Sequence, residues 1–267
     1  MQQRQLIVSI DGDGFIYRTA YDGRWVGEVL FEQVLTQYPF RFCASFIAGE
    51  HQFYPGEFNL ELARRILALD NVDAASHSWS HPHDWREPVD LELEIGESVR
   101  YINRHFLPSG KAADVFLWTG KCNPQSDALA MASSLGLWNL NGGNPAFAWS
   151  GNRNSPQFHQ RALSDWDLMG MVGLYSEARS IDKNPKVYPL LAGHPGNLGG
   201  FKDAIGYFES HPDRPVHVYF HWYSAVRRDS LSALLEVLDW CRSRDLEAVS
   251  VASHLASIAP DPGPTSE

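Results

Sequence analysis

Short apolar runs alternate with longer amphipathic segments along most of the chain. Short runs rich in Val, Ile, Phe and Tyr predict buried strands, whereas apolar residues that recur every three or four positions predict helices. The predicted strands begin with residues 6–15, which close in a glycine-rich turn, and continue at 40–49, 72–76, 114–118, 137–140, 167–174, 187–191, 216–223 and 247–251. The predicted helices lie at residues 25–38, 60–70, 89–106, 124–136, 201–209 and 231–244.

This alternation predicts an α/β fold, because strands joined by helices run parallel with right-handed crossovers. Seven or eight strand–helix units favour a (β/α) barrel over an open doubly wound sheet, and no GxGxxG motif follows the first strand. Residues 1–255 are predicted to form the barrel and residues 256–267 a linker or trimmed tail. Residues 141–164, rich in Gly, Asn, Ser and Pro, are predicted to form a long loop. Active sites of parallel barrels lie at the carboxyl ends of the strands.

Composition narrows the range of partners. The chain has 267 residues, 44% of them hydrophobic, and a formal net charge of −10. This acidity disfavours nucleic acid and anionic lipid and suits neutral or cationic ligands. The three cysteines are widely scattered, so no CxxC motif is present. The first residues lack the apolar core of a signal peptide, and no apolar run is long enough to span a bilayer, so we expect no membrane insertion.

Two carboxylates follow the first predicted strand. Asp11 and Asp13 are two positions apart, so their side chains leave the same face of an extended chain. Two carboxylates this close shift each other's pKa unless a cation lies between them. The pair therefore suits a metal site in which one carboxylate ligates and the other acts as a base. A solvated Asp–Gly turn is the alternative interpretation, since both residue types are favoured in turns.

Histidines follow two other predicted strands. His77 and His81 are four residues apart in a segment too polar for a core, and His221 ends the apolar run VHVYF. A single histidine at such an edge usually makes a structural hydrogen bond. Two histidines and an aspartate from neighbouring strand ends, however, form a facial ligand set with open positions, which suits Zn²⁺ or a similar divalent ion holding a water. His83 is the rival third ligand, and the start of a helix is its alternative interpretation.

Four segments together resemble the polysaccharide deacetylases of the NodB-homology type, carbohydrate esterase family 4. IDGDG is similar to the first motif of that family and HSWSH to its second, while TGKCNPQSDALAMASSLG resembles the third and VYFHWYSA the last. The resemblance spans about residues 6–251. It implies a distorted (β/α)7–8 barrel of the polysaccharide deacetylase type that removes N-acetyl groups from an N-acetylhexosamine exopolysaccharide.

The resemblance also implies a role for each candidate residue. The ligands of a divalent metal ion, with Zn²⁺ favoured, would be Asp13, His77 and His81. Asp11 would take a proton from water as the base, and His221 would protonate the leaving amine as the acid. The metal and a backbone N–H near Lys121 would stabilise the oxyanion. The resemblance further implies a periplasmic or secreted protein whose partners are N-acetylated polysaccharide and other proteins of the exopolysaccharide machinery.

Three departures from the family pattern bear on these roles. Asp-Gly-Asp replaces two adjacent aspartates, which can change the directions of the base and the ligand. No arginine matches the one that orients the base in the third motif, where Lys121 or Asn123 lies nearest. Asn139 and Asn141 replace the aspartate and tryptophan of the fourth motif, so an asparagine stands where a carboxylate would tune His221.

Substrate contacts are predicted from polar and aromatic side chains near the strand ends, where rings can stack on sugars. Core packing is the alternative for each ring. The candidates are Trp79, Lys121, Asn123, Asn141, Trp222 and Tyr223. Two alternative functions stay open. One is a carbohydrate-binding domain of the same fold with weakened catalysis, and the other is a deacetylase of chitin or peptidoglycan.

Overall fold

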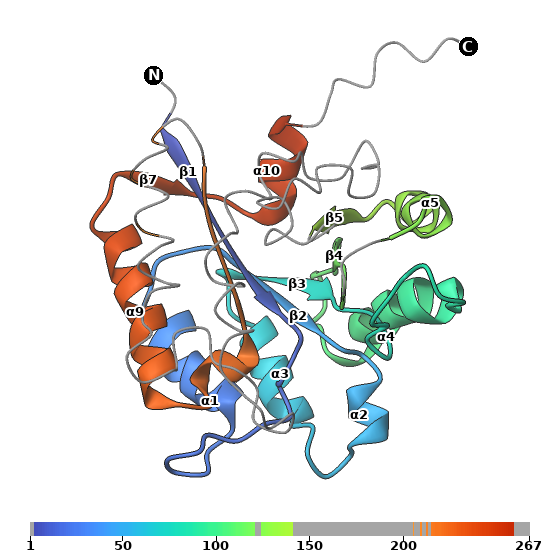
Figure 1. Cartoon of the computed structure of the whole chain (residues 1–267), viewed down its shortest axis with the longest axis horizontal. Helices are drawn as coiled ribbons and strands as arrows, with labels where there is room; N and C mark the ends of the chain where they lie inside the picture. The colour runs from blue at the N-terminus through green and yellow to red at the C-terminus, as the bar shows by residue number, and fades with distance from the viewer. Residues whose placement is uncertain are drawn as a thin grey trace.

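The strands form one parallel sheet. The computed structural model describes residues 3–120, 124–140, 205, 209, 212 and 215–258. Within this part of the chain the strand order is β5-β4-β3-β2-β1-β6, with β7 beside the start of β1. The sheet curls into a half-barrel with helices packed around it (Figure 1), which confirms the predicted α/β barrel class. The strands are β1 (Arg4–Asp11), β2 (Phe42–Phe46), β3 (Val72–Ser76), β4 (Val115–Leu117), β5 (Trp138–Leu140), β6 (Val216–His221) and β7 (Leu246–Ala248).

Helices form where the sequence predicts them at residues 25–38, 60–70, 89–106, 124–136 and 231–244, and two of them contain π-helical turns. α1 (Val26–Leu30) continues as η1 (Phe31–Leu35), and η2 (Glu92–Glu97) leads into α4 (Ser98–His105). The other helical elements are α2 (Glu50–Phe53), α3 (Leu60–Leu67), α5 (Ser126–Ser134), the 3₁₀ segment η4 (Trp222–Ala225), α9 (Arg228–Arg242) and α10 (Val251–Ile258). Across the described residues, none of these helices is both long and apolar enough to cross a membrane.

The structure corrects two details of the predicted elements. A strand is predicted over residues 247–251, but β7 ends at Ala248 and α10 begins at Val251. Val251 and Leu255 are four residues apart and both buried, so the helical spacing prevails and the helix runs on past residue 255. The short helix α2 is not predicted at all. The expected loop at 141–164, the strands at 167–174 and 187–191 and most of the helix at 201–209 lie outside the described residues.

An aromatic layer supports the carboxyl ends of the strands. The ring of Phe15 packs against those of Phe46 and Trp222, with centroids 4.9 and 5.1 Å apart. The indole N–H of Trp222 donates to the carbonyl oxygen of Ser45 at 2.9 Å. All three rings are buried, and an aromatic side chain buries roughly 150–250 Å². The layer therefore gives the ends of β1, β2 and β6 a rigid base.

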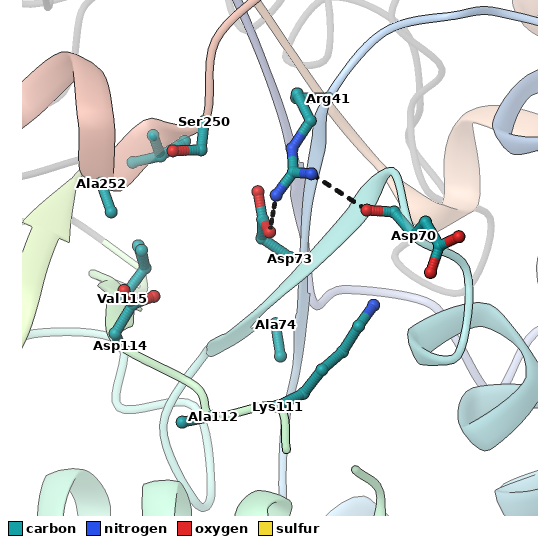
Figure 2. A pocket seen from close by; sticks show the side chains of 11 residues that line it. Arg41, Asp70, Asp73, Ala74, Lys111, Ala112, Asp114, Val115, Ser250 and Ala252 are labelled. Carbon is teal, nitrogen blue, oxygen red and sulfur yellow. Dashed lines mark hydrogen bonds and ion pairs between the residues drawn. The ribbon is translucent and has the colours of Figure 1, made fainter. Parts of the chain in front are cut away.

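A pocket of about 300 Å³ lies at the opposite end of the sheet, where β3 and β4 begin (Figure 2). The side chains of Arg41 and Lys111 in this pocket form ion pairs or hydrogen bonds with nearby residues of the same chain. Arg41 pairs with Asp73 and donates to the carbonyl oxygen of Asp70 at 3.0 Å. Lys111 Nζ donates to the carbonyl oxygens of Leu67, Leu69 and Val72. The amino-terminal face of a parallel barrel serves stability rather than catalysis, so we assign these contacts a structural role.

Candidate metal centre

The turn after β1 places two carboxylates at the mouth of the half-barrel. Asp11 is the last residue of β1, and Asp13 follows after one glycine. A Cβ on Gly12 would lie only 2.8 Å from Cβ of His77 and 3.0 Å from the backbone nitrogen of Ile47. Glycine is therefore the residue that lets the chain pass this close to the neighbouring strand ends. The glycine that distinguishes Asp-Gly-Asp from adjacent aspartates thus has a packing reason.

The loop after β3 carries two histidines on a strained backbone. Ser78 and His81 have φ angles of +65° and +63°, a region that is costly for residues with a Cβ. Two hydrogen bonds from the end of β2 hold the loop: Ala48 N–H donates to Ser78 O at 3.0 Å, and Gly49 N–H to Trp79 O at 2.9 Å. Strain of this kind persists only where the surroundings enforce it, and it concentrates at functional sites.

A buried glutamate on η2 fixes the same loop. Glu94 accepts hydrogen bonds from the backbone N–H groups of Trp79 and Ser80, at 3.0 and 2.8 Å, and from the Ser80 hydroxyl at 2.5 Å. Sequence reasoning missed this residue. Its signal was available, because Glu94 lies three positions after Leu91, beside the apolar stripe of the helix, where a charged residue needs a partner.

We expect Glu94→Gln to weaken metal binding without removing a ligand. The amide offers one acceptor oxygen where three donors now converge, so the loop that carries His81 loses part of its support. Outer contacts of this kind are worth about 10–100-fold in metal affinity. Competition with a chromophoric chelator measures that affinity. Glu92→Gln, an exposed change on the same π-helical turn, is the matched control. Equal affinity of the Glu94 and Glu92 variants would contradict the positioning role of Glu94.

Asp13 lies between the two histidines. Its Oδ2 is 3.1 Å from His77 Nε2 and its Oδ1 is 3.1 Å from His81 Nε2. One potential ligand atom from each residue lies within 4.8 Å of the other two. His77 Nδ1 donates to the carbonyl oxygen of Leu117 at 3.0 Å. A neutral ring then turns the lone pair of Nε2 toward the carboxylate, so a proton or a cation is needed between these two acceptors. Metal-ligating histidines usually donate their other N–H in this way, so the donor set fits a divalent ion.

The charges within this group support one another. Burial alone raises the pKa of Asp13, but the charge of His81 and contacts with both rings outweigh it and hold that pKa well below its ordinary value. Burial alone lowers the pKa of His81, but the charge and hydrogen bond of Asp13 outweigh it and raise the pKa to about 9. The ionised carboxylate is therefore favoured beside a protonated His81, whose positive charge a metal ion can replace.

A second group shares Asp13. Asp11 and His221 are opposite each other in the register of β1 and β6, and both are buried. His221 Nε2 lies 3.7 Å from Oδ2 of Asp11 and 3.7 Å from Oδ2 of Asp13. Burial lowers the pKa of His221 to about 4, although the charge of Asp13 opposes that shift. Asp11, Asp13 and His221 also have the spacing of metal ligands, but the shorter contacts of Asp13 are to His77 and His81.

Another buried glutamate lies near this centre. Glu50 begins α2, and its Oε2 has no hydrogen-bond partner among the described residues. Burial raises the pKa of Glu50 to about 8, the charge of Asp13 adds to the shift, and the charge of His81 opposes it. Sequence reasoning missed this residue too. In the sequence, Glu50 directly follows the strand predicted at residues 40–49, and a charged residue at such a strand end usually faces solvent, so nothing in its neighbourhood pointed to burial.

In metal-free protein, we expect Glu50→Gln to raise Tm at pH 9 and to leave it unchanged at pH 4. The carboxyl has an ordinary pKa of 4.5 and a folded pKa of about 8. Because its pKa is raised in the folded state, the Glu50 carboxyl favours folding only while it is protonated. Its contribution to the stability of the protein is fully present below pH 4.5 and is lost as pH rises through 8. The amide of glutamine cannot ionise, so the variant avoids this loss of stability at high pH. Each kcal/mol of unfolding free energy that is regained should raise Tm by roughly 2–4 °C. Thermal unfolding with chelator, with exposed Glu57→Gln as control, measures it. A Tm difference independent of pH would refute the account.

The six predicted substrate contacts are either outside the described residues or largely buried. Three lie outside the described residues: Lys121, Asn123 and Asn141. Trp222 is completely buried and donates its N–H to Ser45 O, so its ring belongs to the core and cannot stack on a sugar. Trp79 and Tyr223 are 8% and 6% exposed, which leaves only narrow edges of their rings accessible. The ring of Tyr223 stacks on His221 with centroids 4.3 Å apart.

The other candidates from the sequence have structural contacts. Asn139 Oδ1 accepts a hydrogen bond from the indole N–H of Trp118 at 3.0 Å, so this asparagine supports a buried ring. His83 belongs to neither Asp/His group within the described residues. Its backbone instead packs on Gly120, where a Cβ would lie 2.2 Å from the carbonyl oxygen of His83. Asn139 and His83 therefore do not enter the metal centre that we describe.

Solved structures share this fold. No family model and no curated protein matches the sequence. A Mycobacterium smegmatis protein assigned as a polysaccharide deacetylase aligns with TM-score 0.61 and 11% identity, over 96% of this chain and 92% of its own. The family 4 carbohydrate esterase of Streptomyces lividans, solved with acetate, gives TM-score 0.51 and 14% identity over 97% and 98%. The 4-α-glucanotransferase of Thermococcus litoralis gives 0.52 and 14%, and this chain, although 97% covered, spans only 41% of it. At these identities the likeness shows the fold.

Proposed function

We propose that this chain is a metal-dependent hydrolase that removes N-acetyl groups from an N-acetylhexosamine polysaccharide. The proposal rests chiefly on one observation: two overlapping Asp/His groups, which share Asp13, lie together where β1, β3 and β6 end. Deacetylases and carbohydrate esterases are among the structures with this fold, which supports the choice of reaction. The glucanotransferase shows that the fold alone does not decide it.

The metal would be held by Asp13, His77 and His81. A carboxylate and two imidazoles leave open positions for water and substrate, as in catalytic zinc sites, and Zn²⁺ is the ion we favour. When bound, such an ion lowers the pKa of water and polarises the amide carbonyl. The carbonyl of Leu117 sets the orientation of the His77 ring, and Glu94 holds the loop that carries His81.

Asp11 and His221 would move the protons. Asp11 lies beside the metal ligands, where it can accept a proton from the attacking water. His221 would donate a proton to the amine nitrogen as the C–N bond breaks, so the products are acetate and a free amine. Because burial lowers the pKa of His221, the protonated ring is a stronger acid than an ordinary imidazolium and forms over a lower pH range. Proton donation by His221 would therefore favour acidic conditions.

The polymer that we favour is a Pel-like exopolysaccharide. The glycine between the aspartates and the FHWYS run resemble the deacetylase domain of PelA, the periplasmic modifier of that polymer. A periplasmic or secreted location, and contacts with other proteins of the exopolysaccharide machinery, follow from the same resemblance. The net charge of −10 suits this choice, because deacetylation turns a neutral polymer into a cationic one. Chitin and peptidoglycan are the competing substrates.

Acetate release from partly acetylated hexosamine oligosaccharides tests the proposal. We expect release by the metal-loaded protein, loss of release with chelator and recovery when Zn²⁺ is added back. Oligomers of N-acetylglucosamine and N-acetylgalactosamine, assayed side by side, distinguish the polymer classes. Binding of these oligomers without any acetate release would instead support a carbohydrate-binding domain with lost catalysis.

A further inference from the structure

Two consecutive aromatic residues are exposed to solvent at the end of α2, Phe53 in its last position and Tyr54 directly after it. Phe53 is 53% exposed and Tyr54 is 45% exposed. Among the described residues, the other large apolar side chains with comparable exposure are Leu93 and Leu135, on separate elements. α2 follows the end of β2 and projects beyond the sheet at the lower right of Figure 1. Two consecutive exposed aromatic residues at the carboxyl end of the strands call for an explanation, because single exposed apolar residues are common but exposed apolar groups close in sequence are less so.

The ring of Phe53 packs against Gly49 and Trp79 on its covered side. Its Cε2 would lie 2.6 Å from a Cβ on Gly49, so it rests directly on that glycine. The ring also meets Trp79 edge-on, with centroids 6.5 Å apart. Trp79 lies between His77 and His81 in the sequence, and Gly49 N–H donates to its carbonyl oxygen. The exposed ring is therefore tied to the loop that carries the candidate metal ligands.

The backbone beneath Tyr54 is also ordered. Its N–H donates to Glu50 O at 2.9 Å, and its carbonyl oxygen accepts the N–H groups of Glu57 and Phe58 at 2.9 and 2.8 Å. Rigid aromatic side chains offer contact area at a low cost in conformational entropy. A platform built in this way suits a ligand with a flat, partly apolar face, such as the C–H face of a pyranose ring.

The size of the surface argues against a protein partner. A fully buried aromatic side chain covers about 150–250 Å², so two half-exposed rings offer far less than the roughly 1,200–2,000 Å² of a stable protein interface. Its connection to the metal-ligand loop through Trp79 instead suggests that one ligand spans both places. A polymer with its reacting sugar at the metal centre has further sugars to place along this side.

We propose that Phe53 and Tyr54 form a sugar-binding subsite for a hexosamine unit of the polymer next to the one that is deacetylated. This inference rests on the proposed function and adds the residues that recognise chain length. Trp79 is predicted from the sequence as a sugar contact but is mostly covered. The ring of Phe53, which contacts Trp79, is exposed and would make the sugar contact instead.

The test compares acetylated hexosamine substrates of one, three and five sugars. Phe53→Ala and Tyr54→Ala should each lower kcat/KM on the longest oligomer by about three- to tenfold, the range for one aromatic contact, and lower it less on the single sugar. Phe53→Trp should restore most of the preference for long chains. Leu135→Ala, which removes an exposed apolar side chain elsewhere, should keep it unchanged. Calorimetric binding of fully deacetylated oligomers gives a second measure that needs no turnover.

The results distinguish failure of the subsite from failure of the proposed deacetylase reaction. If parent protein releases acetate but the Phe53 and Tyr54 variants keep its full length dependence, the subsite is refuted and the deacetylase proposal stands. If parent protein releases no acetate from any substrate, the proposed reaction fails. Calorimetry then judges the subsite alone: weaker oligomer binding by both alanine variants supports it, and unchanged binding refutes it.

Discussion

Asp11→Asn should lower kcat/KM for acetamide hydrolysis by about 10²–10⁴-fold, the effect of removing a general base, while the protein keeps its metal ion. Asparagine has nearly the shape of aspartate but cannot accept the proton of an attacking water. The proposed ligands Asp13, His77 and His81 are untouched by the change, and Asp13 makes its shorter contacts with these two histidines. Turnover and metal content measured on the same preparation separate the roles of base and ligand.

Asp245→Asn is the matched control for this substitution. Asp245 is an exposed carboxylate that accepts a hydrogen bond from Gln3, far from the strand ends in question. We expect parental turnover and parental metal content from this variant. Loss of metal along with activity in Asp11→Asn would make Asp11 a ligand, and the group of Asp11, Asp13 and His221 would then become the better description of the centre.

His221→Ala should impair acetamide cleavage much more than acetate-ester cleavage. An amine must be protonated as it leaves, whereas an alkoxide or phenolate is a better leaving group and needs the proton less. We expect a loss of about 10²–10⁴-fold on the amide, the range for general acid catalysis, and a far smaller loss on a matched ester. Measuring kcat/KM on both substrates for parent and variant tests the role directly.

The pH dependence of kcat/KM for the same variant tests the general-acid role of His221 independently. An acid works only while it is protonated, so the parent profile on the amide should fall on its basic side, and His221→Ala should lose that limb. Burial and the neighbouring histidines lower the pKa of His221, so the limb should begin below the ordinary histidine value of 6.5. His217→Ala, which removes another buried imidazole from β6, is the control. Equal damage to amide and ester would mean that His221 only supports the strand end.

The elements of the site that follow strands could be predicted from the sequence. Asp11 and His221 end their strands, His77 directly follows β3, and parallel strands end at one edge of a sheet. Asp13 and His81 lie two and four residues further along the same turns. Their convergence therefore needed only the element order and the strand direction. Hydrogen-bond register then added what a pattern cannot supply, namely that Asp11 faces His221 across β1 and β6.

The supporting residues could not be predicted in the same way. Glu94 reaches the metal-ligand loop from another element, and its role depends on how η2 packs, which local spacing does not determine. Burial of two further residues could not be read from the sequence. Trp222 lies in the aromatic layer, although the preceding residue His221 lies beside Asp11 and Asp13. Glu50 is buried although it begins a helix. The short helix α2 lacks the length that makes helical periodicity visible.

Metal content of His81→Ala tests the central claim most directly. Elemental analysis of parent protein loaded with Zn²⁺ and freed of excess ion should give about one ion per chain. His81 is one of the three proposed ligands, and its Nε2 lies 3.1 Å from Asp13 Oδ1, so His81→Ala should retain little metal and release little acetate. His83→Ala, two residues away and outside both groups, should retain the parental amount. A full complement of metal in His81→Ala would contradict the assignment of the centre to Asp13, His77 and His81.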